Sequence, residues 1–355
     1  MTSRERLMAV FNGAMPDRLP WSPCMDNYFT ESLPVRTNGK RLDVVDVCRL
    51  IGADIMERHV PVARVNWKNT EHIRIQDGAK EIWRVGTPVG NLERISVRAG
   101  NTSSVTKYMA NSIEDIKVFS YIFEHMECTP DFAYFLALDE RIGSDGIATV
   151  SAEASPIKVI MELCAGLENT AYLLSDYPDE MEALMEQIHQ ASLERLKVLI
   201  ESPAEVIIAY EDTSTTVLSD KWYEKYSSPY INACADLVSK SGKLFITHMC
   251  GKLKGFVNLI NKDRMHGIDS VCPPDTGDLW AHEALVFWPG KIIIGGIDPV
   301  ALCHMTADET RIYVQEIIAA TAGRSNFILS TGDAVAYGTP LDNLRAVTDV
   351  CQKGL

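Results

Sequence analysis

Short apolar runs recur eight times along this 355-residue chain, and helical patterns separate most of them. Each run is continuously apolar rather than alternating, which indicates a strand buried on both faces, as in a parallel sheet. The runs lie near residues 19–24, 53–57, 146–151, 206–210, 244–248, 268–272, 292–294 and 327–330. Helical patterns between them include residues 157–165, 180–200, 222–238 and 309–320. Eight parallel strands alternating with helices close a barrel, so we predict an α/β fold, the (β/α)8 TIM barrel.

One stretch departs from this alternation. Residues 73–97 alternate polar and apolar side chains around Gly78, Gly86 and Gly90, which predicts an antiparallel hairpin insertion after the second strand. The sequence shows no internal repeat, linker or low-complexity segment. We therefore predict a single domain over residues 1–355.

The charge balance excludes two classes of partner. The formal net charge is −14, and no run of Lys or Arg is longer than two residues. Nucleic acids and anionic membrane surfaces attract clustered basic residues, so we expect neither as a partner. No apolar stretch has the length of a signal peptide or a membrane span, and the nine scattered cysteines favour free thiols in a reducing cytoplasm.

Ionisable or thiol side chains follow every predicted strand, at the end where TIM barrels carry their chemistry. These residues are Asp26, Glu57, His59, Glu153, Glu211, Asp212, His248, Cys250, Cys272, Asp275, Asp298 and Asp333. For Asp275 and Asp298, capping of the next helix is the alternative interpretation. A polar group after each of eight strands indicates an active site at this end of the barrel.

His248 and Cys250 leave the fifth predicted strand together, two residues apart. In an extended segment such residues point to the same side, so both can ligate one metal ion. A nitrogen and sulfur pair suits zinc. A buried cysteine beside a hydrogen-bonded histidine has the same spacing, and the pair alone does not separate the two interpretations.

Three carboxylates are candidate catalytic groups. Glu211 and Asp212 are adjacent, and a like-charge contact between them would raise one pKa into the range useful for acid/base work. Their alternative role is support for His248. Glu153 is a candidate for contact with substrate or metal.

Candidate substrate contacts lie in or just after the first and fourth predicted strands. Trp21, Tyr28 and Tyr210 are candidates to wall an aromatic pocket, with Asp26 beside them; packing in the core is the alternative for the aromatic residues.

Several motifs together resemble those of the uroporphyrinogen decarboxylase superfamily, in the same order and over nearly the whole chain. They are residues 3–7 (SRERL), 17–20 (DRLP), 248–251 (HMCG), 295–298 (GGID) and 338–344 (GTPLDNL). The resemblance implies a (β/α)8 barrel. Decarboxylases of this superfamily carry an arginine-rich segment after the first strand that grips a polycarboxylate, whereas residues 21–28 contain no arginine.

The other branch of the superfamily comprises corrinoid-dependent methyltransferases, which bind zinc through a His-x-Cys pair and a later cysteine. His248 and Cys250 match the pair, and Asp333 stands where that pattern has cysteine. The resemblance therefore implies a Zn²⁺ site formed by His248, Cys250 and Asp333. A carboxylate in place of a thiolate makes the ion more Lewis acidic, which suits an oxygen leaving group.

On this resemblance, the expected activity is transfer of a methyl group from an aryl methyl ether to the Co(I) of a corrinoid carried by a partner protein. Transfer from methylcobamide to a thiol or to tetrahydrofolate is one alternative. A uroporphyrinogen-type decarboxylase, or a barrel that only binds tetrapyrroles, is another. The expected partners are a corrinoid protein and a small methylated substrate; the oligomeric state stays open, with a homodimer as one option.

Overall fold

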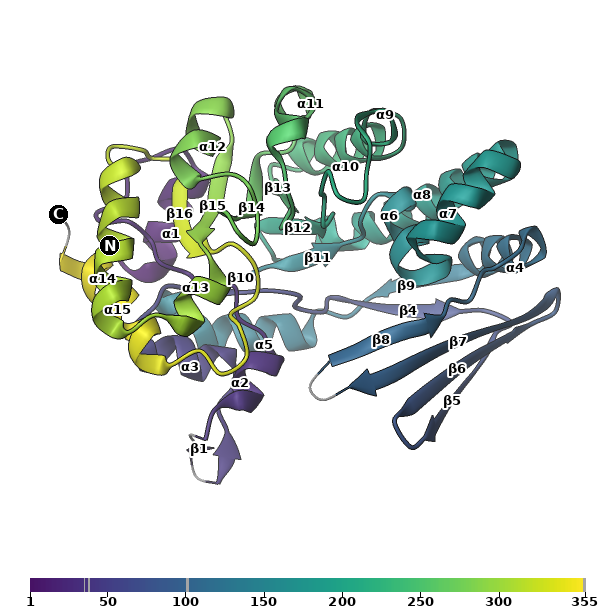
Figure 1. Cartoon of the computed structure of the whole chain (residues 1–355), viewed down its shortest axis with the longest axis horizontal. Coiled ribbons are helices and arrows are strands. Elements are labelled where there is room, and N and C mark those ends of the chain that lie inside the picture. Colours follow the sequence, from purple (N-terminus) through teal and green to yellow (C-terminus); the bar gives the residue numbers. More distant parts are fainter. Residues whose placement is uncertain (35, 38, 100–101, 354–355) are drawn as a thin grey trace.

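The structure is a computed structural model and describes residues 1–34, 36–37, 39–99 and 102–353. Its centre is a set of parallel strands that lie in chain order, with β12 to β16 side by side in Figure 1. The strands are β3 (Ile55–Glu57), β10 (Gly146–Ala148), β11 (Val150–Ala152), β12 (Val206–Tyr210), β13 (Leu244–His248), β14 (Gly267–Val271), β15 (Ile292–Ile297) and β16 (Phe327–Thr331). β10 pairs with β3 and β11 pairs with β12, so these two short strands act as one strand of the set.

Backbone hydrogen bonds join the first predicted strand to a neighbour on each side. Trp21 forms a parallel bridge with Leu329 of β16, and Ser22 N donates to Leu329 O at 2.9 Å. On the other side, Asp54 N donates to Trp21 O at 2.8 Å, next to the start of β3. All eight predicted strand positions are found in parallel order, which confirms the predicted (β/α)8 TIM-barrel fold.

Helices lie outside the strands and connect them (Figure 1). Capping boxes begin α1, at Thr2 and Glu5, and α14, at Thr306 and Glu309. The helices are α1 (Ser3–Phe11), α2 (Asn27–Ser32), α3 (Val44–Ile51), α4 (Ile113–Glu124), α5 (Ala133–Ile142), α6 (Pro156–Val159), α7 (Gly166–Asp176), α8 (Pro178–Glu201), α9 (Asp220–Trp222), α10 (Ser228–Lys240), α11 (Val257–Lys262), α12 (Ala281–Phe287), α13 (Pro299–His304), α14 (Ala307–Ala320) and α15 (Leu341–Lys353). Across the described ranges, no helix has both the length and the apolar character that a membrane crossing requires.

The barrel interior has an apolar end and a polar end. Alternate strand residues share one face, and Val206, Ile208, Ile246 and Ile294 form a buried cluster with residues of α1. Tyr210 and His248 lie on the same faces, two residues after Ile208 and Ile246, at the carboxyl ends of β12 and β13. The polar layer at this end therefore rests on a packed apolar layer.

The insertion after β3 is larger than predicted. A four-stranded antiparallel sheet forms where a hairpin is predicted over residues 73–97, and a further antiparallel pair connects it to the barrel (Figure 1). Its strands are β4 (Ala63–Trp67), β5 (Glu71–Asp77), β6 (Lys80–Thr87), β7 (Gly90–Ala99), β8 (Thr102–Lys107) and β9 (Met126–Pro130). A separate short hairpin joins β1 (Arg36–Thr37) to β2 (Lys40–Arg41). β8 consists almost entirely of Ser, Thr and Lys, so it lacks the apolar alternation that predicted β5, β6 and β7.

The Asp54 carboxylate, which is fully buried, holds the N-terminal segment against β3. It accepts hydrogen bonds from Arg6 Nη1 at 2.7 Å, Arg18 Nη2 at 3.0 Å and Trp21 N at 3.0 Å. We predict that Asp54→Ala lowers the free energy of unfolding by about 2–4 kcal/mol, because Arg6 keeps only its ion pair with the exposed Asp17 and the buried Trp21 N–H loses its acceptor. Urea unfolding measures this change.

Asp145→Ala is the matched control. Asp145 accepts from Arg49 at 2.8 Å in an exposed ion pair, so its loss should cost only about 0–1 kcal/mol. Equal losses of stability in the two variants would refute the importance of the buried carboxylate.

Candidate metal centre

Three inward-facing residues lie in register on neighbouring strands. Tyr210 of β12 pairs in register with His248 of β13, which pairs with Asp269 of β14. His248 Nδ1 donates to Asp269 Oδ2 at 2.8 Å. Arg58, directly after β3, donates from Nη2 to Asp269 Oδ1 at 3.1 Å across the barrel interior. His248, Asp269 and Arg58 are all buried, so this chain of polar groups is fixed by packing and hydrogen bonds.

These contacts set the orientation of the His248 ring. Burial raises the pKa of Asp269, but the Arg58 charge and the His248 hydrogen bond outweigh it and hold that pKa well below its usual range. Asp269 is thus an anion that keeps the proton on Nδ1 of His248. Nε2 is left to face the barrel mouth, as a metal-ligating histidine requires.

The loop after β12 is tied directly to the end of β13. The backbone N–H groups of Glu211 and Asp212 both donate to His248 O, at 3.0 and 3.1 Å. Asp212 has a φ of 40°, an unfavourable left-handed conformation for a residue with a side chain. The two hydrogen bonds hold this conformation and bring the Asp212 carboxylate to His248.

Gly251 lets the loop after β13 approach the loop after β12. A Cβ atom at this position would lie 2.3 Å from Ser214 Cβ and 2.4 Å from Thr213 O. Only glycine fits so close an approach. The Gly of the HMCG motif therefore positions Cys250 beside Asp212.

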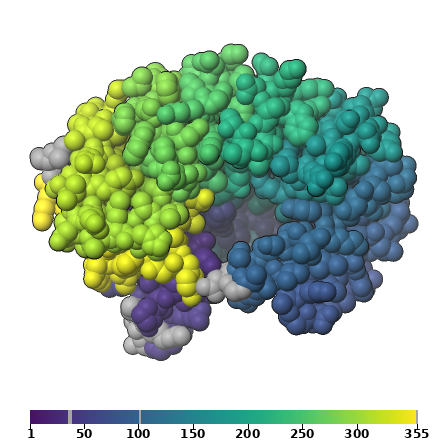
Figure 2. Space-filling view, in the orientation of Figure 1, coloured from purple at the N-terminus to yellow at the C-terminus, as the bar shows by residue number. Residues whose placement is uncertain are grey.

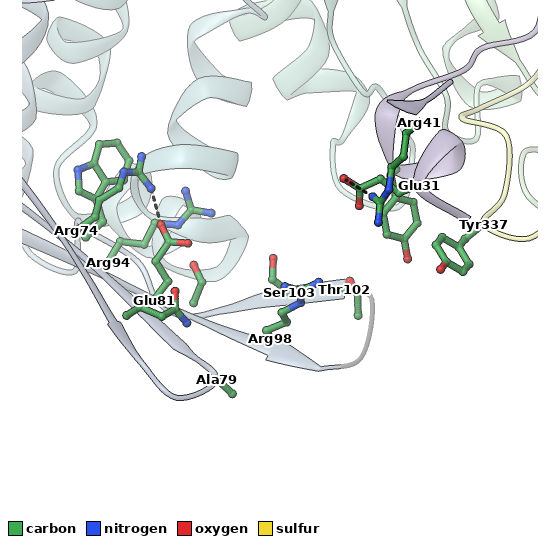
Figure 3. Close-up of a pocket in the computed structure, with 14 residues that line it drawn as sticks. Glu31, Arg41, Arg74, Ala79, Glu81, Arg94, Arg98, Thr102, Ser103 and Tyr337 are labelled. Atoms are coloured by element: carbon green, nitrogen blue, oxygen red, sulfur yellow. Dashed lines mark hydrogen bonds and ion pairs between the residues drawn. The ribbon is translucent and has the colours of Figure 1, made fainter. Parts of the chain in front are cut away.

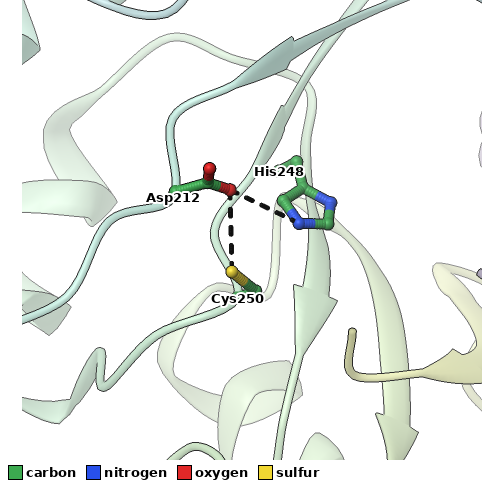
Figure 4. A group of neighbouring side chains, drawn as sticks. All are labelled: Asp212, His248 and Cys250. Carbon is green, nitrogen blue, oxygen red and sulfur yellow. Dashed lines mark hydrogen bonds and ion pairs between the residues drawn. The ribbon is translucent and has the colours of Figure 1, made fainter. Parts of the chain in front are cut away.

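Asp212, His248 and Cys250 form a group of three possible metal ligands (Figure 4). Asp212 Oδ1 lies 3.6 Å from His248 Nε2 and 3.6 Å from Cys250 Sγ, and the three ligand atoms lie within 4.8 Å of one another. Bond lengths of about 2.0–2.3 Å place neighbouring ligands of a tetrahedral zinc about 3.4–3.5 Å apart. The oxygen, nitrogen and sulfur atoms therefore fit a zinc ion with little rearrangement.

The electrostatic environment of this group favours a cation. Burial, followed by the negative charges of Asp333 and Asp212, raises the pKa of the Cys250 thiol far above its usual value. Burial lowers the pKa of His248, but the hydrogen bond to Asp269 and the nearby carboxylates raise it overall. The carboxylates that disfavour a thiolate here would attract a divalent cation, which stabilises the thiolate in turn.

Asp333, the predicted third ligand, follows β16. Its carboxylate raises the pKa values of His248 and Cys250, and it accepts a hydrogen bond from Ala334 N at 2.7 Å. It is not a member of the ligand group found among the described residues, where Asp212 takes the carboxylate position. Ligation by Asp333 stays a prediction.

The two predicted catalytic glutamates have local partners. Both oxygens of the buried Glu211 accept hydrogen bonds from Ser155, from N at 2.6 Å and Oγ at 2.8 Å. Burial raises the pKa of Glu211 to about 7, and Asp212 is not among the causes, so the predicted like-charge contact is not the reason. Glu153 forms an ion pair with Arg195 of α8. Both contacts tie the rim of the barrel to its helices.

The four predicted substrate contacts lie in different environments. Trp21 is fully buried in the first strand and offers no surface to a ligand; packing in the core explains it. Asp26 caps α2 by accepting from Phe29 N at 2.9 Å. Tyr28 is exposed. Tyr210 lies next to the metal group, with its ring 4.8 Å from that of His248.

Two further residues of this site, Arg58 and Asp269, were not singled out from the sequence, and His59 was predicted only as one of the residues at the barrel rim. His59 has a φ of 59° and stacks on Tyr210 with ring centroids 3.9 Å apart. Asp269 and Arg58 hold His248 as described. The available signal was an aspartate inside the apolar run 268–272, since a charge within a buried strand needs a partner.

Comparisons with known proteins identify the family and the fold. The model of the family described as uroporphyrinogen decarboxylase (URO-D) matches residues 93–354, which include Asp212, His248, Cys250 and Asp333. Uroporphyrinogen decarboxylases of Chlamydia abortus and Chlamydia caviae are 24% and 23% identical over 224 residues. These alignments cover 61% of this chain and 65% of the length of each relative.

A solved structure described as a methyltransferase from Methanosarcina mazei has the same fold. It superposes with a TM-score of 0.65 and 16% sequence identity, over 99% of this chain and 99% of that one.

The identity of the carboxylate ligand can be tested by paired substitutions. We predict that Asp212→Asn weakens zinc binding about hundredfold or more, because it removes one of three ligands, and that Asp333→Asn weakens it about tenfold or less. Competition with a chromogenic chelator measures both affinities. The reverse order of effects would give the ligand position to Asp333, and no zinc binding by the unaltered chain would refute the site.

Zinc affinity should rise with pH. Binding has to displace the thiol proton of Cys250 at any pH below its raised pKa, and also a proton of His248 when the imidazole is charged. Affinity should then increase about tenfold per pH unit for each proton displaced. Chelator competition between pH 6 and 8 measures the slope. Cys250→Ala should bind more weakly with a slope smaller by one proton; equal slopes would exclude Cys250 as a ligand.

Proposed function

The chain belongs to the uroporphyrinogen decarboxylase family, and on this premise we propose that it is a zinc-dependent methyltransferase. The proposed reaction moves a methyl group from an aryl methyl ether to the Co(I) of a corrinoid that a partner protein carries. The observation that carries the proposal is the group of Asp212, His248 and Cys250 at the carboxyl end of the barrel strands. Three ligands leave one tetrahedral position for a substrate atom, which is typical of a catalytic zinc.

The donor set favours an oxygen-containing substrate. One carboxylate, one imidazole and one thiolate donate less electron density than a site with two thiolates. A bound zinc ion of this kind would supply Lewis-acid polarisation to the ether oxygen that has to leave as an anion. This support is the same whether Asp212 or Asp333 provides the carboxylate.

Residues around the group are suited to hold the substrate. The Tyr210 hydroxyl is buried and has no hydrogen-bond partner among the described residues, so it can donate to an oxygen of the substrate. His59 stacks on the other side of the Tyr210 ring and is exposed toward solvent, where it can shield a bound aromatic ring. Arg58 and Asp269 act indirectly, because they fix the direction of His248 Nε2.

A decarboxylase activity is the second candidate, favoured by the names of the Chlamydia relatives. A substrate with several carboxylates needs arginine partners beside the reacting centre. Residues 21–28, the corresponding segment of this chain, contain none, and Asp26 in this segment caps a helix. This candidate is therefore the weaker one.

The direct test combines purified protein, zinc, a reduced corrinoid protein and an aryl methyl ether. We expect methylation of the corrinoid, followed by its absorption spectrum, and a loss of about hundredfold or more in rate for Cys250→Ala. Cys303→Ala, at a half-buried cysteine of α13, is the control and should retain the rate.

Two parallel assays separate the alternatives. Transfer from methylcobamide to a thiol would reverse the proposed direction, and loss of CO₂ from uroporphyrinogen would support the decarboxylase. Unchanged corrinoid methylation by Cys250→Ala would refute the role of the metal group.

A further inference from the structure

A cavity of about 730 Å³ lies between the inserted sheet β5–β8 and the rim of the barrel (Figure 3). The face shown in Figure 2 is hollowed between the blue insertion and the purple and yellow segments. Side chains of β5, β6, β7 and β8 line one side; Tyr28, Glu31, Arg41 and Tyr337 line the other. None of the candidate metal ligands lines it, so it is separate from the metal group.

The lining is positively charged in an acidic chain. It contains four arginines and two glutamates, an excess of two positive charges, although the whole chain has a net charge of −14. The arginines are Arg41, Arg74, Arg94 and Arg98. Arg74 pairs with Glu81, and Arg41 lies 3.6 Å from Glu31. An excess of guanidinium groups around a concave surface attracts anions.

Strand register places two of these arginines on either side of an indole ring. Arg74 of β5 is paired with Trp83 of β6, and Trp83 is paired with Arg94 of β7. The Arg74 guanidinium lies 4.5 Å from the centre of the Trp83 ring. This cation–π contact orients the guanidinium group. The backbone positions of Arg74 and Arg94 are therefore fixed by strand pairing, and the Arg74 side chain is also held by its contact with Trp83.

Arg94 has a buried donor without an acceptor. Its Nε atom is shielded from solvent and has no hydrogen-bond partner within the described part of the chain. A buried unsatisfied donor is costly, and most such donors in proteins are paired. A carboxylate or phosphate oxygen bound at the Arg94 guanidinium would satisfy it after a rotation of the side chain that exposes Nε to the cavity.

Two tyrosine rings face Arg74 and Arg94 from the other side of the cavity. Tyr28 and Tyr337 lie with ring centroids 5.0 Å apart, and both are more than 40% exposed. Exposed aromatic rings inside a concave site favour contact with a flat apolar group. The arginine side of the cavity therefore suits an anionic group, and the tyrosine side suits an apolar ring of the same ligand.

We propose that this cavity binds a small organic anion, a planar ring that carries a carboxylate or phosphate group. The anionic group pairs with Arg94 and its neighbours, and the ring extends from them toward Tyr28 and Tyr337 on the opposite side of the cavity. The cavity volume lies within the range of about 300–1,000 Å³ that small-molecule sites occupy, and walls on two sides favour a small ligand over a protein surface. The proposal does not depend on the methyltransferase activity.

Calorimetric titrations on metal-free protein test this site with benzoate, phenyl phosphate, inorganic phosphate and neutral benzamide. We expect benzoate or phenyl phosphate to bind about tenfold or more tightly than benzamide, and high salt to weaken that binding. Comparing carboxylate with phosphate identifies the anionic group. Inorganic phosphate should bind more weakly than phenyl phosphate, since it lacks the ring.

Three variants locate the binding. Arg94→Gln, and Arg41→Gln at an exposed position where folding is not at risk, should each weaken binding, Arg94→Gln by about tenfold or more. Arg84→Gln is the matched control, because Arg84 lies on β6 outside the cavity lining and pairs with Glu93 at 2.8 Å.

Cys250→Ser should leave binding unchanged, which separates this site from the metal group. Equal affinities for benzamide and the two ring anions, or an equal loss in Arg84→Gln and Arg94→Gln, would overturn the proposal. Inorganic phosphate that binds as tightly as phenyl phosphate would also overturn it.

Discussion

The candidate metal centre depends on one buried carboxylate, that of Asp269. A fully buried anion is stable only if its oxygens are paired, and Asp269 has Arg58 on one oxygen and His248 on the other. These two contacts connect β14 to the segment after β3 and to β13. Since the same hydrogen bond fixes the tautomer and direction of His248, the barrel interior determines where a metal can bind. Removing Asp269 would leave Arg58 as an uncompensated buried charge and His248 without its orienting partner.

The other two ligands are placed by backbone contacts rather than by side-chain pairs. His248 O accepts two N–H groups from the loop after β12, and this turns Asp212 into the site despite its unfavourable φ. Gly251 permits the close contact between loops that brings Cys250 alongside. The strained residue and the required glycine both occur where two parallel strands end, which is where such barrels position functional groups. The group is therefore assembled by the ends of two neighbouring strands, held together by main-chain geometry.

The barrel could be predicted from the sequence because its strands are buried on both faces and read as continuous apolar runs. His248 and Cys250 could be predicted as a pair because their spacing alone places them on one side. The choice between Asp212 and Asp333 could not, since each follows a strand and the direction of each side chain depends on loop conformation. Trp21 and Glu153 show the same limit of sequence reasoning. Both were predicted as functional residues from their positions near strand ends, yet Trp21 lies in the core and Glu153 pairs with Arg195. Sequence position defines which end of the barrel a residue occupies, not which neighbour it contacts.

In the insertion, strand pairing brings together charged residues whose alternating pattern in the sequence does not indicate a binding site. Arg74 and Arg94 lie 20 positions apart in the chain and look like solvent-facing residues of an exposed sheet. Register with Trp83 sets them side by side, and the fold turns this face toward Tyr28 and Tyr337. Those two tyrosines follow the first and last strands of the barrel, so the positive cavity opens at the same end as the negative metal group. An acidic chain thus presents two sites of opposite charge at one end, and the charge of each follows from local pairing rather than from overall composition.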